Sequence, residues 1–149
     1  MALNFDKIAI KGNEFLKDLA KELGYPEDTN KAGRVLKAIL HALRNQLTVE
    51  ESVQLMAQFP LFLKAVYVEN WSLRKQDNKP RNMTEFIHEI KKINKQTAQH
   101  DFKTDDDVDH AIAVVFMSLR KYVSLGELED IKAVLPKDLK LIVNNVLMI

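Results

Sequence analysis

Four cationic side chains follow one another at helical spacing in the first third of the chain. They step by three, four and three positions: Arg34, Lys37, His41 and Arg44. Residues at this spacing share one face of an α-helix, so the pattern predicts a basic stripe. A basic stripe can bind an anionic ligand or an acidic partner helix, and it is also typical of the solvated face of an amphipathic helix. A plain solvated face is therefore the leading interpretation, and an anion-binding surface is the alternative hypothesis.

A second group combines aromatic, acidic and basic residues. Tyr67, Glu69 and Trp71 are followed closely by Arg74 and Lys75. Tryptophan is enriched among the residues that dominate protein–protein binding, so the group is a candidate partner-binding site. In the alternative interpretation, Trp71 fills a seam inside the protein and its N–H is bonded to a carbonyl group.

Catalytic and metal-binding patterns are missing from the chain. It has no cysteine, no glycine-rich phosphate loop and no Gly-x-Ser-x-Gly sequence. The one dense group of potential metal ligands, His100–His110, lacks the spacing of a calcium loop, and acidic residues at a helix start are explained by capping. None of the four histidines clearly lies on an apolar face as a haem ligand would. The sequence predicts no enzyme activity, no metal and no cofactor.

An internal repeat shows which elements must position these residues. The stretch Ala42–Val66 recurs as Ser118–Ile142, 76 positions later and without a gap. The identities between the two copies are Leu43/Leu119, Arg44/Arg120, Glu51/Glu127, Ala57/Ala133, Pro60/Pro136, Leu63/Leu139 and Lys64/Lys140. A fixed offset of this kind indicates a duplicated supersecondary unit.

Each copy also repeats the residues that mark a helical corner. The predicted structural corners consist of Arg44, Thr48, Glu51 and Pro60 in the first copy, and of Arg120, Ser124, Glu127 and Pro136 in the second. The hydroxyl residue and the glutamate three positions later favour a capping box, and proline favours the first position of a helix. Each arginine ends a long helix, so we expect it to brace its own corner, with the glutamate as one partner for it. A pair of anion-binding arginines is the alternative.

Hydrophobic periodicity predicts four helices in each repeat, in the order long, long, short, short. The expected ranges are about 5–23, 30–46, 49–58 and 60–68, then 83–96, 105–123, 125–134 and 136–147. Gly12 lies within the first helix and favours close packing or a kink there. We therefore predict a single all-α domain over residues 1–149, with a repeat at about 4–70, a connector at 71–82 and a second repeat at 83–147. The two repeats are expected to pack about a pseudo-two-fold axis.

Composition limits the remaining possibilities. The formal net charge is +1, which disfavours nucleic acid as a partner. No apolar run approaches the length of a membrane span, and the first ten residues do not resemble a signal peptide. The absence of cysteine fits a reducing compartment, so we expect a cytoplasmic protein.

The region that holds these motifs also resembles a known family. A long helix ending in Leu43-Arg44, the run Leu47-Thr48-Val49-Glu50-Glu51, the proline corner at Pro60 and the closing Trp71 are similar to the signature region of the prokaryotic proteins grouped as domain of unknown function 2267. The second half carries the matching Ser124-to-Leu139 run, so the resemblance covers nearly the whole chain. Phe59 replaces the usual leucine, and Asn70 stands where glycine is common. The resemblance implies an all-helical fold and assigns no catalytic residue.

Two functions from different classes remain. The first is a non-catalytic protein-interaction module that binds a protein partner or forms a homodimer. The alternative is a binder of a small molecule or anion in the groove between the two repeats.

Overall fold

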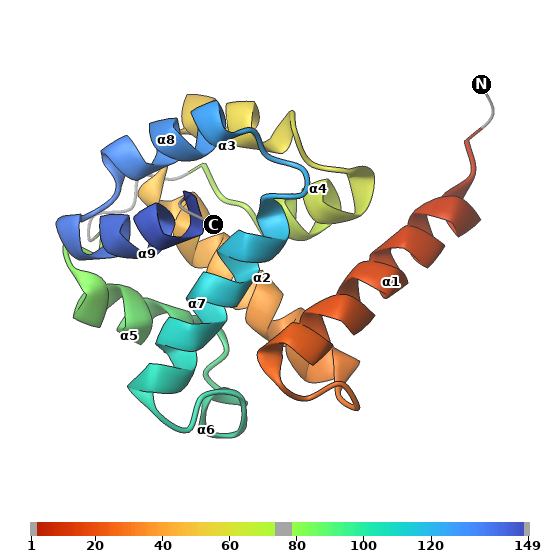
Figure 1. Cartoon of the computed structure of the whole chain (residues 1–149), viewed down its shortest axis with the longest axis horizontal. Helices are drawn as coiled ribbons and strands as arrows, with labels where there is room; N and C mark the ends of the chain where they lie inside the picture. Colours follow the sequence, from red (N-terminus) through yellow and green to blue (C-terminus); the bar gives the residue numbers. More distant parts are fainter. Residues whose placement is uncertain (1–2, 74–78, 148–149) are drawn as a thin grey trace.

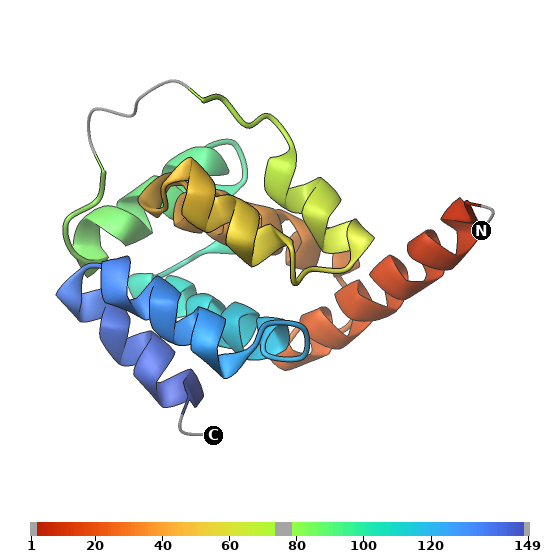
Figure 2. The ribbon, with the colours of Figure 1, turned by 90° about the horizontal axis from the view of Figure 1, so that it is seen from above.

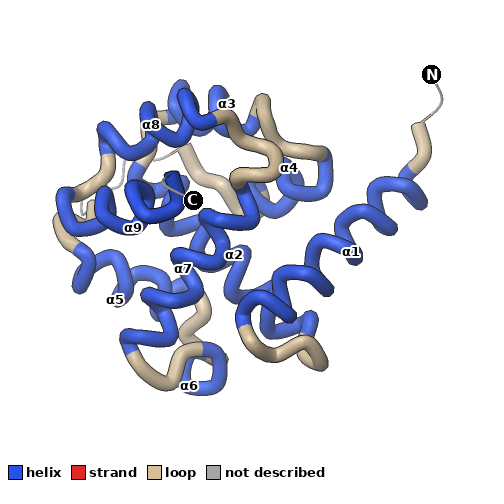
Figure 3. Tube along the Cα trace, viewed as in Figure 1, coloured by secondary structure: helices blue, strands red, loops and turns tan. Residues whose placement is uncertain are grey.

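The computed structural model describes residues 3–73 and 79–147, and within these ranges the chain forms α-helices and no strand (Figure 3). The helices are α1 Phe5–Leu23, α2 Thr29–Gln46, α3 Val49–Met56, α4 Leu61–Val68, α5 Met83–Ile93, α6 Ala98–Asp101, α7 Asp105–Leu119, α8 Leu125–Val134 and α9 Lys137–Leu147. The all-α fold predicted from the sequence is confirmed. Most helix ends lie within one or two residues of the expected positions.

The short helix α6 was not expected. It lies between the helices expected at about 83–96 and 105–123, where only a connection was expected. Helices α5 and α7 also end earlier than predicted, at Ile93 and Leu119. After α7 the apolar residues Tyr122 and Val123 continue the pattern although the backbone has left the helix, so periodicity alone overestimates its length.

Helix α2 is the central element of the fold (Figure 1). It packs against α1, α4, α5, α6 and α7, and eleven of its eighteen residues are buried. A helix surrounded in this way must bury more than one face, which agrees with the wide apolar face of its sequence. Because α2 also carries the four cationic residues, part of that basic stripe must face other elements.

The structural corners form as local sequence predicts. Thr48 Oγ1 accepts from the Glu51 N–H at 3.1 Å, and a carboxylate oxygen of Glu51 accepts from the Thr48 N–H at 2.8 Å, which completes the capping box. Ser124 Oγ accepts from the Glu127 N–H at 3.1 Å. Pro60 is the N-cap of α4, one position earlier than expected.

In the second repeat, the Pro136 carbonyl accepts from the N–H groups of Leu139 and Lys140 at the start of α9. Burial raises the pKa of Glu127, and the charges of Asp130 and Glu51 raise it further. Arg120 is the C-cap residue of α7.

Buried apolar side chains from both repeats form one hydrophobic core cluster. Its largest fully buried members are Tyr67, Phe86, Phe116, Leu19, Ile39, Leu40, Leu43, Leu55, Leu63, Ile90, Ile112 and Leu119. The core therefore joins helices from the two sequence repeats. Their relation by a pseudo-two-fold axis stays a prediction.

Helix α1 extends beyond the rest of the protein at its N-terminal end (Figures 1 and 2). Its C-terminal half packs on α2 and α7, whereas Leu3 and Phe5 near its start are 78% and 70% exposed. At Gly12 the helix lies close to α4, because an added Cβ would lie 3.2 Å from the Cβ of Phe62. Close packing against α4 thus explains this glycine.

No helix in residues 3–73 and 79–147 combines the length and the apolar content that crossing a bilayer requires.

Candidate functional site: a cationic cleft beside helix α2

A cleft of about 710 Å³ lies where α2 and the end of α4 face the segment between α5 and α6. Its lining residues are Arg34, Lys37, His41, Arg44, Asn45, Asn70, Trp71, Ser72, Ile93, Asn94, Lys95, Gln96 and Thr97. All four members of the predicted basic stripe and the tryptophan of the predicted partner site therefore lie in one place. The lining contains cations, amides and hydroxyls, and no carboxylate from the described part of the chain.

One end of the cleft is fixed by an ion pair between Arg34 and Asp101. Arg34 donates from Nη2 and Nε to the two Asp101 carboxylate oxygens, at 2.8 and 3.1 Å. The Thr97 hydroxyl donates to the same carboxylate at 2.7 Å, and the Asp101 side chain has no exposed surface. Burial raises the pKa of Asp101, but the hydrogen bonds from Arg34 and Thr97 outweigh it and leave the pKa below its usual value. The pair joins α2 to α6 across the two repeats.

Lys37 lies one turn further along α2 and forms an ion pair with the end of α4. Its Nζ is 3.1 Å from the Glu69 carboxylate. The two side chains are 36% and 51% exposed, so solvent screens this pair and it adds little stability. A ligand can therefore compete for Lys37 at low energetic cost.

His41 is buried and neutral. Its Nε2–H donates to the Val66 carbonyl oxygen at 2.8 Å. Burial lowers the pKa of His41 more than this hydrogen bond raises it. The fixed Nε2–H tautomer gives His41 a structural role, because its donor is already used to hold the last turn of α4.

Arg44 holds the end of α4 more extensively. Its Nη1 donates to the carbonyl oxygens of Tyr67 and Glu69, at 2.6 and 3.0 Å, and its guanidinium lies 5.7 Å from the centre of the Trp71 ring. Arg44 is only 7% exposed, and its Nε is buried without a hydrogen-bond partner. Burial lowers its pKa, although an arginine remains charged at physiological pH. This cation therefore lies beside the cleft with carbonyl groups and an indole ring as its described neighbours.

Arg44 donates to backbone carbonyls at the end of α4, and its role as a brace of its own corner stays a prediction. Glu51 is not its partner, because that carboxylate completes the capping box with Thr48. The interpretation as a solvated basic face does not describe α2, since His41 and Arg44 are buried against α4. Anion binding by the stripe remains a hypothesis.

The chain reverses after α4 in a way that places Trp71 in the cleft. Asn70 has φ 56°, the left-handed conformation that favours glycine and that asparagine tolerates. This conformation gives a physical reason for the glycine expected at this position. Trp71 then lies half-buried, edge-on to Tyr67, and its ring faces Arg44. No described residue accepts a hydrogen bond from its indole N–H, so the predicted carbonyl partner is not found among them.

The other members of the predicted partner site are placed differently. Tyr67 has no exposed surface; its hydroxyl is 2.7 Å from Ser52 Oγ, and burial raises its pKa to about 12. It supports Trp71 from inside the core and cannot contact a partner directly. Glu69 is exposed, whereas Arg74 and Lys75 lie outside the described residues.

The side of the cleft formed by the second repeat was not predicted from the sequence. The Asn94 amide donates to the Arg34 carbonyl oxygen at 2.8 Å, and the neighbouring Lys95 is exposed without an ion pair to any described residue. The Asn45 amide donates to Glu89 at 2.9 Å, and the other carboxylate oxygen of Glu89 is buried without a partner. Burial raises the pKa of Glu89. No local motif marks these residues.

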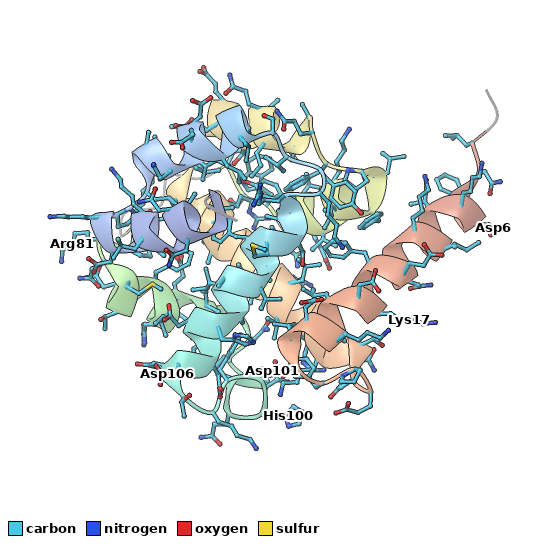
Figure 4. The ribbon with its side chains drawn as sticks, viewed as in Figure 1. Asp6, Lys17, Arg81, His100, Asp101 and Asp106 are labelled. Carbon is cyan, nitrogen blue, oxygen red and sulfur yellow. The ribbon has the colours of Figure 1, made fainter. Side chains whose placement is uncertain are left out.

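The acidic cluster before α7 acts in helix capping. Thr104 and Asp107 form a capping box, and Asp105 pairs with Lys91 at 2.6 Å. Asp106 lies at the outer end of α7, while Asp101 belongs to α6 and pairs with Arg34 (Figure 4). In the described ranges, no group of three or more His, Asp or Glu side chains is placed to hold a metal ion.

Comparison with known proteins assigns the chain to a family without assigning a function. A search of curated proteins finds no match. The family model described as uncharacterized conserved protein (DUF2267) matches residues 12–142, which include every helix that lines the cleft. The resemblance seen in the sequence is thereby confirmed, and the chain belongs to the DUF2267 family of uncharacterized conserved proteins.

Proposed function

We propose that this protein binds a small anionic molecule in the cleft beside α2 and catalyses no reaction on it. The observation that supports the proposal is the composition of the lining, which holds four cationic groups that are charged at neutral pH and no described carboxylate. These cations are Arg34, Lys37, Arg44 and Lys95. The cleft volume of about 710 Å³ lies in the range of small-molecule sites.

The four cations differ in what neutralises them. Arg34 and Lys37 are paired with Asp101 and Glu69, whereas Arg44 and Lys95 have no carboxylate partner among the described residues. An excess of two positive charges therefore faces the cleft. Partly buried cations attract an anion more strongly than surface cations do, because less water screens them.

The same contacts favour binding over catalysis. The His41 donor is committed to the Val66 carbonyl, and the Thr97 hydroxyl is committed to Asp101. With Nε2–H donating, His41 keeps Nδ1 as its proton acceptor, and no hydrogen bond among the described residues joins this nitrogen to a nucleophilic side chain. As part of the proposal, we place the protein in the cytoplasm, because a chain without cysteine suits a reducing compartment.

Isothermal titration calorimetry with pyrophosphate and citrate, at constant ionic strength, tests the proposal. We expect saturable one-site binding that weakens about tenfold in Lys95→Gln, which corresponds to about 1.4 kcal/mol. The matched control is Lys17→Gln, which removes an exposed cation from α1, away from the cleft (Figure 4). If neither anion binds, or if both variants weaken binding equally, the cleft is not an anion site.

A second candidate function is self-association through α1. The motivating observation is that Leu3, Phe5 and Ile10 at the extended end of this helix are 78%, 70% and 58% exposed. Size-exclusion chromatography with light scattering is expected to show a dimer that dissociates in Phe5→Ser/Ile10→Ser. A wild-type protein that stays monomeric at high concentration would exclude this function.

A further inference from the structure

We propose that the ligand of the cleft is a nucleotide, that is, a phosphate group joined to a planar heterocyclic ring. This inference rests on the proposed function and specifies the class of anion. It follows from an unequal distribution of side chains, because cations without aromatic neighbours line one end of the cleft and the single tryptophan lines the other.

The phosphate end is formed by Lys37 and Lys95. Asn94, the neighbour of Lys95, is bonded to the backbone of Arg34, so the α5–α6 segment brings Lys95 toward the Arg34 end of α2. Lys37 lies one turn from Arg34, and only an exposed carboxylate competes for it. A ligand can therefore displace the carboxylate from Lys37, while Lys95 has no described carboxylate partner to displace. Two flexible lysines of this kind suit a phosphate group, which accepts hydrogen bonds from several directions. Arg34 itself is held by Asp101 and closes this end.

The ring end is formed by Trp71 and Arg44. Edge-on contact with Tyr67 and the nearby Arg44 guanidinium hold the indole in place. Any of the nucleobases can stack on an aromatic side chain, because every base presents a π-face. Asn70 precedes Trp71 and also lines the cleft, so an amide lies close to the ring position.

Asn45 adds a group that can form a hydrogen bond with the polar edge of a nucleobase. Its amide nitrogen donates to Glu89, which fixes the orientation of the side chain. No described residue donates to the side-chain oxygen of Asn45, so this oxygen is an available acceptor. Asn45 follows Arg44 in the sequence, and both residues line the cleft. An acceptor suits the exocyclic amino group of adenine, guanine or cytosine.

The spacing of the two ends matches a nucleotide in size. Lys37 and Arg44 are seven residues apart on α2, which corresponds to about 10 Å along the helix axis. A ligand with phosphate at one end and a base at the other can span this distance. The ligand would therefore gain affinity from both.

Titration calorimetry with ADP, GDP, UDP, pyrophosphate and adenosine tests this inference. We expect at least one nucleotide to bind about tenfold or more tightly than both pyrophosphate and adenosine. Trp71→Leu should remove most of this advantage, because it should weaken the binding of the nucleotide much more than that of pyrophosphate, and Trp71→Phe, which keeps a ring, should retain part of it. Lys95→Gln should weaken nucleotide and pyrophosphate alike, and circular dichroism checks that each variant is folded.

The outcomes separate the two proposals. Pyrophosphate binding as tight as that of every nucleotide, with no effect of Trp71→Leu, would overturn the nucleotide assignment and leave the anion site intact. If neither nucleotides nor pyrophosphate bind, both proposals fail. Tight binding of adenosine alone would also overturn the assignment, because the phosphate end would then contribute nothing.

Discussion

Arg34 and Asp101 are 67 positions apart in the chain and form a two-pronged ion pair, with contacts of 2.8 and 3.1 Å. The pair connects the central helix of the first repeat to the short helix that only the second repeat possesses. It thereby fixes the position of the α5–α6 segment and the width of the cleft at one end. The arginine is partly exposed, whereas the Asp101 side chain is fully buried.

Removal of Arg34 should therefore cost more stability than removal of the Asp101 charge. We expect Arg34→Gln to lower the free energy of unfolding by about 3 kcal/mol, because it leaves a buried carboxylate without its partner. Asp101→Asn should cost about 1–2 kcal/mol, since Arg34 can turn toward water. Urea denaturation measures both values. Equal losses, or no loss in Arg34→Gln, would contradict the proposed role of the pair.

The acid sensitivity of the protein should also depend on Asp101. Its folded-state pKa lies below the value in the unfolded chain, so its contribution to stability is complete above about pH 4 and is lost as pH falls through the folded-state pKa. In Arg34→Gln, burial raises the pKa of Asp101 and only the Thr97 hydrogen bond still lowers it, so the acid-induced loss that Asp101 causes should become smaller. Urea denaturation of both proteins recorded against pH shows whether the variant loses less free energy of unfolding than wild type below about pH 4.

His41 should produce a second pH-dependent loss nearer to neutrality. Because its folded-state pKa is lowered, the neutral form contributes stability above about pH 6.5, and this contribution is lost as the pH falls below that value. His41→Gln keeps an N–H donor for the Val66 carbonyl and removes the titration. We expect this variant to lose less stability than wild type between about pH 7.5 and about pH 5.5. His88→Gln, at an exposed position on α5, is the control and should behave like wild type.

Arg44 should be sensitive even to a change that keeps its positive charge. Arg44→Lys removes the paired donors that serve the Tyr67 and Glu69 carbonyls, so we expect a loss of about 2 kcal/mol in unfolding free energy. A shift in Trp71 emission should accompany this loss, because the guanidinium beside the ring is gone. The comparable change Lys17→Met, at an exposed site on α1, should alter neither quantity. A fully stable Arg44→Lys would show that α4 does not depend on these bonds.

The left-handed residue before Trp71 gives a local prediction. Asn70→Gly should be neutral or slightly stabilising, because glycine adopts φ 56° without strain. Asn70→Val should cost about 1–2 kcal/mol, since a branched side chain clashes in this conformation. The thermal unfolding midpoints of the two variants measure this difference in stability. Similar midpoints for Gly and Val would mean that the turn relaxes to another conformation.

Local features of the fold were predictable from the sequence, because the residues that cause them are neighbours. Thr48 and Glu51 are three positions apart, and so are Ser124 and Glu127; each pair determines a helix start by itself. The helix α6 was missed because four residues are too short to show a period.

The candidate site was only partly predictable. The stripe on α2 follows from spacing, but its burial against α4 depends on contacts such as Arg44 to Tyr67 that no spacing reveals. Asp101 was noted only within a group of potential metal ligands, and nothing in its local sequence points to Arg34. Lys95 carries no signal at all, because an exposed lysine is common and its position opposite α2 is set by the fold.

Trp71 makes a direct measurement of the central claim possible. It is the only tryptophan in the chain and lies in the lining of the cleft, so its fluorescence reports on that site alone. We would titrate wild-type protein and Lys95→Gln with pyrophosphate at constant ionic strength and follow the emission. A saturable change in wild type that requires about tenfold more pyrophosphate in Lys95→Gln is the predicted result. An emission that stays constant up to millimolar pyrophosphate, in a folded protein that also shows no heat of binding in calorimetry, would contradict an anion site beside α2.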